Sequence, residues 1–266
     1  MKAIVNGIEV HYIEVGNSHA LPIILVHAFP LNHEMWQPQI ESLAKRFRVI
    51  AYDIRGYGKT MTPDSQYMIE FLVDDLIGLL DYLKIERAIL CGLSLGGYIA
   101  LRTVERNPER VLALILADTQ SKPDSNEAKL RRAAAIKLIK TQGVEAYAGN
   151  LVKTLLTSDT LTNKPDMVEW VKEMIKAGSP SAICAALLAM AGRTDTTPNL
   201  PNINVPTLIL VGEHDQSTTP ILAQEMHEKI VNSEMHVIPN AGHLSNVENP
   251  NEFNKHMLNF LANIKS

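Results

Sequence analysis

The residue with the clearest chemical signature is a serine that lies between two glycines. Residues 92–96 read Gly-Leu-Ser-Leu-Gly, which matches the pattern Gly-x-Ser-x-Gly with Ser94 at its centre. An apolar, strand-like run precedes this pattern at residues 88–91, and a helix-like run follows it at residues 98–101. A sharp turn between a strand and a helix exposes the serine hydroxyl, and the free amides of the helix start favour developing negative charge. These features predict that Ser94 is a nucleophile.

A serine hydroxyl is a poor nucleophile unless a base removes its proton. The histidines that follow Ser94 in the chain are His214, His227, His236, His243 and His256. Of these, His243 occupies a loop that comes after the last predicted strand and before the final predicted helix. A loop at the carboxyl edge of a sheet is suitably placed to bring an imidazole over the serine. We therefore predict His243 as the base.

A carboxylate is expected to hold the imidazole in its working tautomer and to stabilise the imidazolium. Asp215 lies in a polar turn directly after a buried-strand pattern at residues 207–212. Two other carboxylates compete for this role, because Glu213 shares the same loop and Asp118 ends an earlier strand at the same edge. The position of the loop favours Asp215 as the acid.

Acyl transfer also needs hydrogen-bond donors where the carbonyl oxygen becomes negative. The backbone amide of Leu95, which follows the nucleophile, is predicted to be one donor. The second is predicted to be the amide of Phe29, in the loop after the apolar run at residues 22–26, since Pro30 has no N–H. We expect His27 at the start of this loop to brace it through hydrogen bonds, not to act as a base.

A sheet must bring these distant residues together. Eight segments have strand patterns: residues 3–5, 8–14, 22–26, 48–52, 87–93, 111–117, 207–212 and 234–238. Several are continuous apolar runs, which are typical of strands buried on both faces of a parallel sheet. The strand, helix and strand patterns over residues 87–117 form one βαβ unit, and Asn6-Gly7 predicts a hairpin between the first two strands.

The middle of the chain has a different pattern. Strand signals are missing from residues 119–197, which show helical patterns instead, at residues 127–142, 144–156, 165–177 and 180–191. A helical block between two strands of one sheet indicates an insertion. We predict a core made of residues 1–118 and 198–266, with residues 119–197 inserted as a helical cap.

Composition excludes several other classes of protein. The 266 residues carry a net charge of −4, with no basic footprint of the kind that binds nucleic acid. The two cysteines, Cys91 and Cys184, are too few for a disulfide framework. The N-terminal segment lacks the apolar core of a signal peptide, and the longest apolar stretches fall short of a membrane span. We therefore expect a cytoplasmic protein without membrane insertion, although the mature form of an exported protein would have the same features.

Five segments, taken together and in order, resemble the α/β-hydrolase superfamily along essentially the whole chain. They are His-Ala-Phe-Pro at residues 27–30, Asp-Ile-Arg-Gly-Tyr-Gly at 53–58, Gly-Leu-Ser-Leu-Gly-Gly at 92–97, Gly-Glu-His-Asp at 212–215 and Gly-His at 242–243. The short subgroup that the chain resembles includes 3-oxoadipate enol-lactonases, small carboxylesterases and cofactor-free haloperoxidase-type esterases. This resemblance implies an α/β-hydrolase fold, a mostly parallel eight-stranded sheet flanked by helices with an inserted helical cap.

The resemblance also implies roles for individual positions. Asp53 and Arg55 would be structural and would join loops below the active site. Ala28 stands where the family usually has glycine, and this substitution leaves the Phe29 amide available. A serine at position 94 argues against dehalogenase or epoxide hydrolase activity, because those relatives have an aspartate there.

The sequence thus predicts a serine hydrolase that cleaves small carboxylic esters or lactones without a metal or organic cofactor. Carbon–carbon bond hydrolysis, perhydrolysis and a slow-turnover small-molecule receptor are the alternatives. Trp36, Trp170 and Leu187 are candidates for the wall of the substrate pocket. Arg132 and Arg193 are candidate cations for a dicarboxylic lactone, although both are more typical of surface charges. The physiological substrate and the oligomeric state are not predicted.

Overall fold

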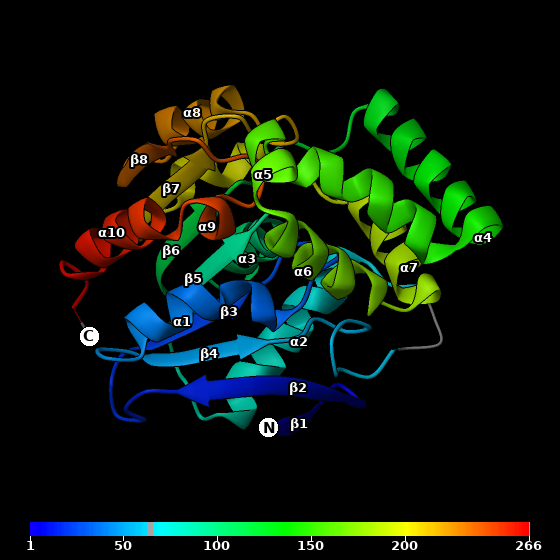
Figure 1. Cartoon of the computed structure of the whole chain (residues 1–266). Coiled ribbons are helices and arrows are strands. Elements are labelled where there is room, and N and C mark those ends of the chain that lie inside the picture. The colour runs from blue at the N-terminus through cyan, green and yellow to red at the C-terminus, as the bar shows by residue number, and fades with distance from the viewer. Residues whose placement is uncertain (63–65, 266) are drawn as a thin grey trace.

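A computed structural model describes residues 1–62 and 66–265 of the chain. Eight strands form one sheet in the order β1-β2-β4-β3-β5-β6-β7-β8 (Figure 1). They are β1 (Lys2–Val5), β2 (Ile8–Val15), β3 (Pro22–Val26), β4 (Arg48–Tyr52), β5 (Ala88–Leu93), β6 (Val111–Ala117), β7 (Thr207–Gly212) and β8 (Ser233–Ile238). Antiparallel pairing is found for β1 with β2 and for β2 with β4, and the other neighbours pair in parallel. The predicted fold class is therefore confirmed.

The strand sequences explain the burial of the central strands and the first hairpin. In β5 and β7 every residue is buried, as expected for strands covered by helices on both faces. The hairpin between β1 and β2 turns at Asn6 and Gly7, whose φ angles of 48° and 79° suit the turn that matches the twist of two paired strands. The hairpin predicted at Asn6-Gly7 is confirmed.

Helices cover both faces of the sheet. The core helices are α1 (Gln37–Leu43), α2 (Ile69–Tyr82), α3 (Leu95–Arg106), α8 (Pro220–Lys229), α9 (Ser245–Glu248) and α10 (Pro250–Leu261), with short 3₁₀ turns at His33–Trp36, Pro108–Arg110 and Thr197–Asn202. Helix α3 packs on β3, β5 and β6, and α2 packs on α3. Helix α1 packs on α10, and Figure 1 shows this pair on the opposite side of the sheet from α2 and α3.

Four helices follow β6 and precede β7: α4 (Asn126–Leu155), α5 (Ser158–Asn163), α6 (Pro165–Lys176) and α7 (Pro180–Ala191). They form a block beside the carboxyl ends of the parallel strands (Figure 1), in which α4 packs against α6 and α7. We call residues 119–197 the helical insertion. Helix α4 bends at Gly143, where φ is 85°, so it consists of two helices that correspond to the predicted helices at 127–142 and 144–156. The short helix α5 was not predicted.

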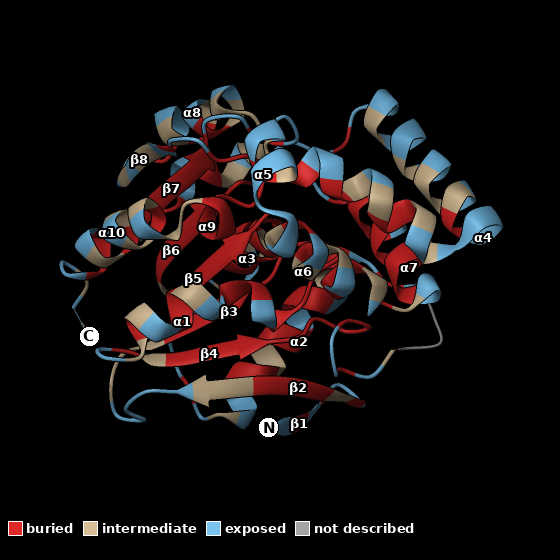
Figure 2. Cartoon of the chain, in the orientation of Figure 1, coloured by how far each residue is buried: buried red, intermediate tan, exposed pale blue. Residues whose placement is uncertain are grey.

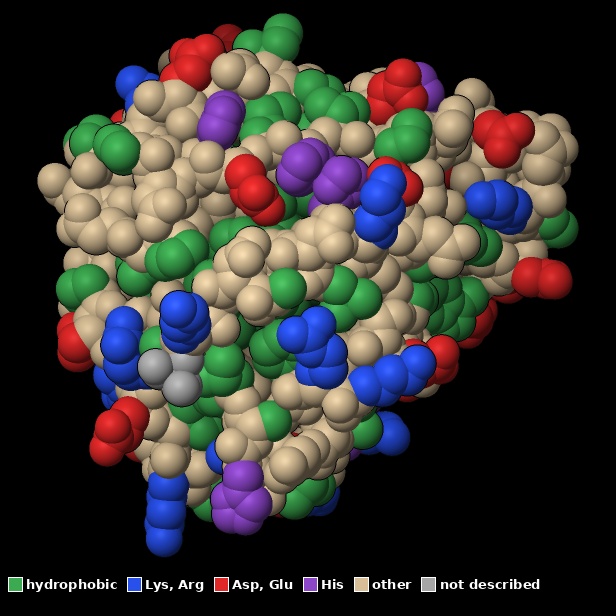
Figure 3. All heavy atoms as spheres, turned by 90° about the vertical axis from the view of Figure 1, so that its left-hand side faces the viewer, with side chains coloured by type: hydrophobic (Ala, Val, Ile, Leu, Met, Phe, Trp, Pro, Cys, Tyr) green, Lys and Arg blue, Asp and Glu red, His purple; other side chains and the backbone are tan. Residues whose placement is uncertain are grey.

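Buried residues lie in the central strands and on the inward faces of the helices, whereas the first half of α4 is largely exposed (Figure 2). On the outer face formed by β8 and α10, the rings of His236 and His256 stack with centroids 3.9 Å apart. Figure 3 shows this face, where acidic and basic side chains are interspersed.

In the described chain no single helix has the length and apolar character of a membrane span. The pair of helices α6 and α7, which are bent by 91° relative to each other, has that length and apolar character only when the two are taken together.

Candidate active site

The turn between β5 and α3 has the strained geometry that presents a serine side chain. Ser94 has φ 54° and ψ −110°, a conformation that is rare for residues other than glycine. A Cβ atom on Gly92 would lie 2.2 Å from the carbonyl oxygen of Gly96, and one on Gly96 would lie 2.1 Å from the carbonyl oxygen of Val26. Glycines are therefore required on both sides of the serine, which is the physical reason for the sequence pattern.

The side chains of Ser94, His243 and Asp215 lie in one hydrogen-bonded chain. His243 follows β8 in a loop, and its Nε2 lies 2.9 Å from Ser94 Oγ. Its Nδ1 lies 2.8 Å from Oδ2 of Asp215. A carboxylate only accepts hydrogen bonds, so Nδ1 carries the proton and the free lone pair of Nε2 faces the serine hydroxyl. This arrangement can remove the proton from Ser94.

Local donors hold Asp215 in place. Its Oδ1 accepts hydrogen bonds from the backbone amides of Ser217 at 2.7 Å and Thr218 at 3.0 Å. Its Oδ2 accepts a third, from the Thr218 hydroxyl at 2.7 Å. Thr218 was not predicted, although an aspartate side chain commonly accepts hydrogen bonds from backbone amides two or three residues later in the chain.

Electrostatics separate the pKa values of the acid and the base. Burial raises the pKa of Asp215, but attraction to His243 and the hydrogen bonds from His243 and Thr218 outweigh it and bring the pKa to about 2. Burial lowers the pKa of His243, but the charge and hydrogen bond of Asp215 outweigh it, so this pKa lies above 6.5. The pair is therefore arranged so that the carboxylate stays charged and stabilises a transient imidazolium.

The two rival carboxylates have other partners. Glu213 is exposed, and its Oε2 accepts a hydrogen bond of 3.0 Å from the backbone amide of Asn240. Asp118 is fully buried and accepts hydrogen bonds from the Gly212 amide at 2.8 Å and the Ser245 hydroxyl at 2.5 Å. Burial and the nearby charge of Asp215 raise the pKa of Asp118 to about 8. Within residues 1–62 and 66–265, neither carboxylate hydrogen-bonds the His243 ring.

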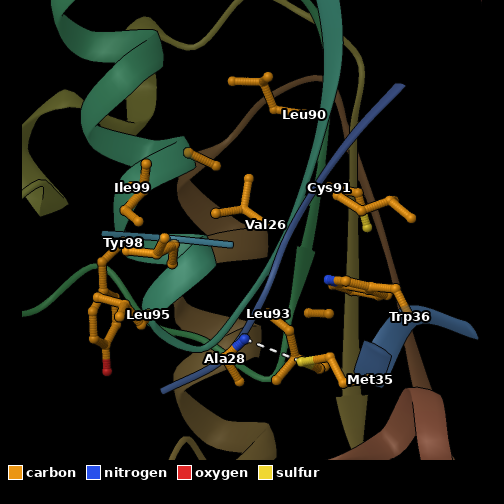
Figure 4. Packing of buried hydrophobic residues seen from close by; sticks show 14 of the residues in the cluster. Val26, Ala28, Met35, Trp36, Leu90, Cys91, Leu93, Leu95, Tyr98 and Ile99 are labelled. Atoms are coloured by element: carbon orange, nitrogen blue, oxygen red, sulfur yellow. Dashed lines mark hydrogen bonds between the residues drawn. The ribbon is translucent and has the colours of Figure 1, made fainter. Parts of the chain in front are cut away.

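The loop after β3 is braced as expected. His27 donates from Nδ1 to the carbonyl of Ala28 at 2.9 Å, and its Nε2 accepts from the Ile54 amide at 2.9 Å. Burial lowers the pKa of His27 to about 4, so the ring is neutral, as these two bonds require. The expectation that His27 acts as a brace is confirmed. The Ala28 amide points to Met35 Sδ at 3.2 Å (Figure 4), so this amide is already engaged.

The amides of Leu95 and Phe29 remain as donors for a ligand. Leu95 is the first residue of α3, and the amides at the start of a helix have no partner within it. In the described part of the chain, the Phe29 amide donates no hydrogen bond to another protein group. Phe29 is itself buried, with its ring 6.3 Å from that of Tyr57.

The three predicted pocket-wall residues occupy different environments. Trp36 is fully buried in the core (Figure 4). Its ring lies 6.3 Å from that of Phe253 of α10, and Leu187 is buried on α7. Trp36 is 0% exposed and Leu187 is 2% exposed. Trp170 lies on α6 at a groove of about 230 Å³ between the helical insertion and the core, opposite His33 and Lys59. Of the three, Trp170 borders a solvent-accessible groove.

The two candidate cations of the helical insertion are paired with one aspartate. Arg193 is 7% exposed, so the expectation of a surface charge is wrong for this residue. Both Arg193 and Arg132 bind the carboxylate of Asp124, and Arg193 also lies over the ring of Tyr98 at 4.2 Å. Two guanidinium groups and one carboxylate leave a net positive charge at this cluster, and among the described residues Nε of Arg193 has no hydrogen-bond partner.

Asp53 is the centre of a structural cluster, as the resemblance implied. Its Oδ1 accepts from the Nδ1 and the backbone amide of His33, and its Oδ2 from the His11 ring and the Lys59 amide. Arg55 forms a buried ion pair with Asp75 at 2.6 Å. The side chains of His11, His33 and Asp53 lie close enough to share a metal ion. Their mutual hydrogen bonds already use both carboxylate oxygens and both Nδ1 atoms and explain the cluster without an ion.

This fold and site define the class of the protein. The model of the family described as alpha/beta hydrolase fold matches residues 22–250, and the chain belongs to this family. It is therefore a hydrolase of the α/β class, and the resemblance seen in the sequence is confirmed.

Individual relatives and solved structures show which members of this family the chain is similar to. The chain is 33% identical over 247 residues to 3-oxoadipate enol-lactonase 2 of Acinetobacter baylyi, a match that covers 93% of this chain and 91% of that protein. The structure of the present chain is similar to that of the malate-bound thermophilic esterase from Thermogutta terrifontis, with a TM-score of 0.94 and 35% identity. The match covers 100% of this chain and 99% of that one. The structure is also similar to that of the enol-lactonase from Burkholderia xenovorans LB400, with a TM-score of 0.92 and 32% identity over 98% and 100% of the two chains.

Proposed function

We propose that this protein hydrolyses small carboxylic esters or lactones, with Ser94 as nucleophile, His243 as base and Asp215 as acid. The observation that carries the proposal is the chain of hydrogen bonds from Ser94 Oγ to His243 at 2.9 Å and from His243 to Asp215 at 2.8 Å. These are the distances at which a base takes a proton from a nucleophile. The similarity to an esterase and to enol-lactonases supports the same reaction class.

The reaction proceeds in two halves. His243 Nε2 takes the hydroxyl proton as Ser94 Oγ attacks the carbonyl carbon, and the amides of Phe29 and Leu95 bind the oxyanion. The tetrahedral intermediate collapses, the bond to the alcohol oxygen breaks, and His243 returns the proton to that oxygen. Water, deprotonated by His243, then attacks the acyl-enzyme, and the acid is released as Ser94 regains its proton. In a lactone the alcohol stays attached to the acyl group.

The helical insertion acts as the cap of this site in our proposal, with the core in residues 1–118 and 198–266. Ser94 is 8% exposed, which favours small substrates that reach it along a narrow path. Between the two substrate classes we favour neutral esters, because they need no cation in the pocket, whereas a dicarboxylic lactone would need a cation such as Arg132 or Arg193 near Ser94. The similarity to enol-lactonases keeps lactones as the second candidate class.

Hydrolysis of short-chain p-nitrophenyl esters and of simple lactones by the wild type and Ser94→Ala tests the proposal. We expect Ser94→Ala to lose about 10⁴-fold or more in kcat, because the hydroxyl forms the acyl-enzyme. Ser42→Ala on α1, which removes a hydroxyl bonded to the helix backbone and to Asn254, is the matched control and should retain activity. Wild-type turnover that survives in Ser94→Ala would refute the proposed nucleophile. A preference for carboxylate-bearing lactones over neutral esters would select the second substrate class.

A further inference from the structure

A buried glutamate stands beside the candidate base and contacts two separate parts of the protein. Glu248 ends α9, five residues after His243, and is 5% exposed. Its two carboxylate oxygens have different partners, one in the helical insertion and one in the loop of His243. A buried carboxylate needs such donors, because an unpaired charge in the interior is strongly destabilising.

The first oxygen binds the helical insertion. Thr157, which caps the start of α5, donates to Glu248 Oε1 from its backbone amide at 2.9 Å and from its hydroxyl at 2.8 Å. Two donors on one charged oxygen make strong hydrogen bonds. The junction between α4 and α5 is therefore attached to the core at this carboxylate.

The second oxygen binds the loop that carries the base. The amide of Gly242 donates to Glu248 Oε2 at 2.6 Å, and the next amide, that of His243, donates to the carbonyl of Leu155 in the helical insertion at 2.9 Å. A Cβ atom on Gly242 would lie 3.1 Å from both Glu248 Oε2 and the Leu155 oxygen. The two segments are thus packed tightly enough that an alanine at position 242 would require a small shift of its neighbours.

We propose that Glu248 is a positioning residue that ties the helical insertion to His243, an inference that rests on the proposed function of His243 as the base. Asp215 orients the imidazole ring, whereas Glu248 and Leu155 hold the backbone from which the ring projects. Movement of the α4–α5 junction therefore displaces His243 relative to Ser94. Glu248 contacts no reacting atom and acts through Gly242 and His243.

The opposite side of the helical insertion is held more weakly. The hydroxyls of Tyr57 and Tyr67 reach the carbonyl of Ala182 on α7 at 3.5 Å and 3.4 Å, which is long for bonds from a hydroxyl. The hydrogen bonds between the insertion and the core are therefore stronger at the α4–α5 junction than at α7.

Glu248→Gln tests this role, because a neutral amide turns its NH₂ group toward donors on one of the two sides. We expect kcat for p-nitrophenyl acetate, per active site counted by burst titration, to fall about 10–100-fold as the base is misplaced, while KM changes less than about twofold. Glu252→Gln on α10, whose carboxylate pairs with Lys255 and His256 at the surface, is the matched control and should retain the wild-type kcat. An unchanged kcat per active site in Glu248→Gln would overturn the proposal.

Thr157 provides the second arm of the test. Thr157→Val removes the hydroxyl bond to Glu248 and should lower kcat, whereas Thr157→Ser keeps the hydroxyl and should restore it. If both residues act through one link, the double variant Glu248→Gln/Thr157→Val is no slower than Glu248→Gln alone. Independent, additive losses would mean that the link does not position the base.

Hydrogen exchange measures the link without reference to catalysis. In Glu248→Gln we expect faster exchange of the amides at residues 155–157 and 242–243, while the amides of β5 keep wild-type protection. Exchange that is faster at every amide, or unchanged at residues 155–157 and 242–243, would contradict the inference. If instead the wild type hydrolyses no ester or lactone, the proposed function fails, and the exchange result still shows whether Glu248 joins the two segments.

Discussion

The hydroxyl of Ser245 donates a hydrogen bond of 2.5 Å to Oδ2 of Asp118, and this bond joins the end of β6 to the loop of His243. The other oxygen of Asp118 accepts the amide of Gly212 at the end of β7. Asp118 thus connects the strand ends that carry the base and the acid, and it does so without contacting the imidazole.

Asp118→Asn should therefore be a mild substitution. Burial and the charge of Asp215 raise the pKa of Asp118 to about 8, so these surroundings disfavour a charge at this position and tolerate a neutral amide. We expect a loss in kcat/KM of about tenfold or less, the value of one neutral hydrogen bond. Asp215→Asn should lose about 10⁴-fold, because the imidazole adopts the wrong tautomer. Equal losses in the two variants, measured with the same ester, would contradict the assignment of Asp215.

The activity should depend on pH through His243. The base must be neutral, so kcat/KM falls as the pH falls through the pKa of His243, and Asp215 holds that pKa above 6.5. The acid limb of the pH–rate profile is expected to have its midpoint above this value. In Asp215→Asn, burial still lowers the pKa of His243, but the carboxylate charge that raised it is gone. The acid limb of the residual activity should therefore have its midpoint at a lower pH. A midpoint that is unchanged or higher in Asp215→Asn would show that another group controls the profile.

Glycine should be required at position 96 for steric reasons. Gly96→Ala places a Cβ atom 2.1 Å from the carbonyl oxygen of Val26, and we expect the free energy of unfolding to fall by about 3 kcal/mol or more. Gly149→Ala in α4 is the matched control, since nothing lies within 4 Å of its new Cβ. That variant should gain about 0.5–1 kcal/mol from helix propensity. Urea denaturation of both variants checks the contrast, and a stable Gly96→Ala would refute the close approach of α3 to β3.

Asp53 should contribute to stability and not to the chemistry. Asp53→Asn turns an NH₂ group toward the donors of His11, His33 or Lys59, so we expect the free energy of unfolding to fall by about 3–5 kcal/mol. Asp74→Asn, which removes an exposed ion pair with Arg106, should change it by less than about 1 kcal/mol. Comparable effects of the two substitutions in urea denaturation would show that the Asp53 cluster is not the anchor that its contacts indicate.

Much of the fold is visible in local patterns. Continuous apolar runs mark the buried strands β3, β5 and β7, because a strand covered on both faces tolerates few polar side chains. Gly92 and Gly96 identify the turn at Ser94, since close backbone contacts exclude any Cβ atom there. Steric demands of this kind act on single positions, so the sequence expresses them directly.

Partnerships between distant side chains are not visible in this way. Asp118, Glu213 and Asp215 all follow strands at one edge of the sheet, and the loop position favours Asp215 as the acid without excluding the other two. Only the folded backbone brings one of them, Asp215, to 2.8 Å from Nδ1 of His243. The pairing of Arg193 with Asp124 and the link from Glu248 to Thr157 were likewise not predicted. Apolar burial depends on periodicity, which each segment carries alone, whereas a directional hydrogen bond depends on the relative placement of segments far apart in the chain.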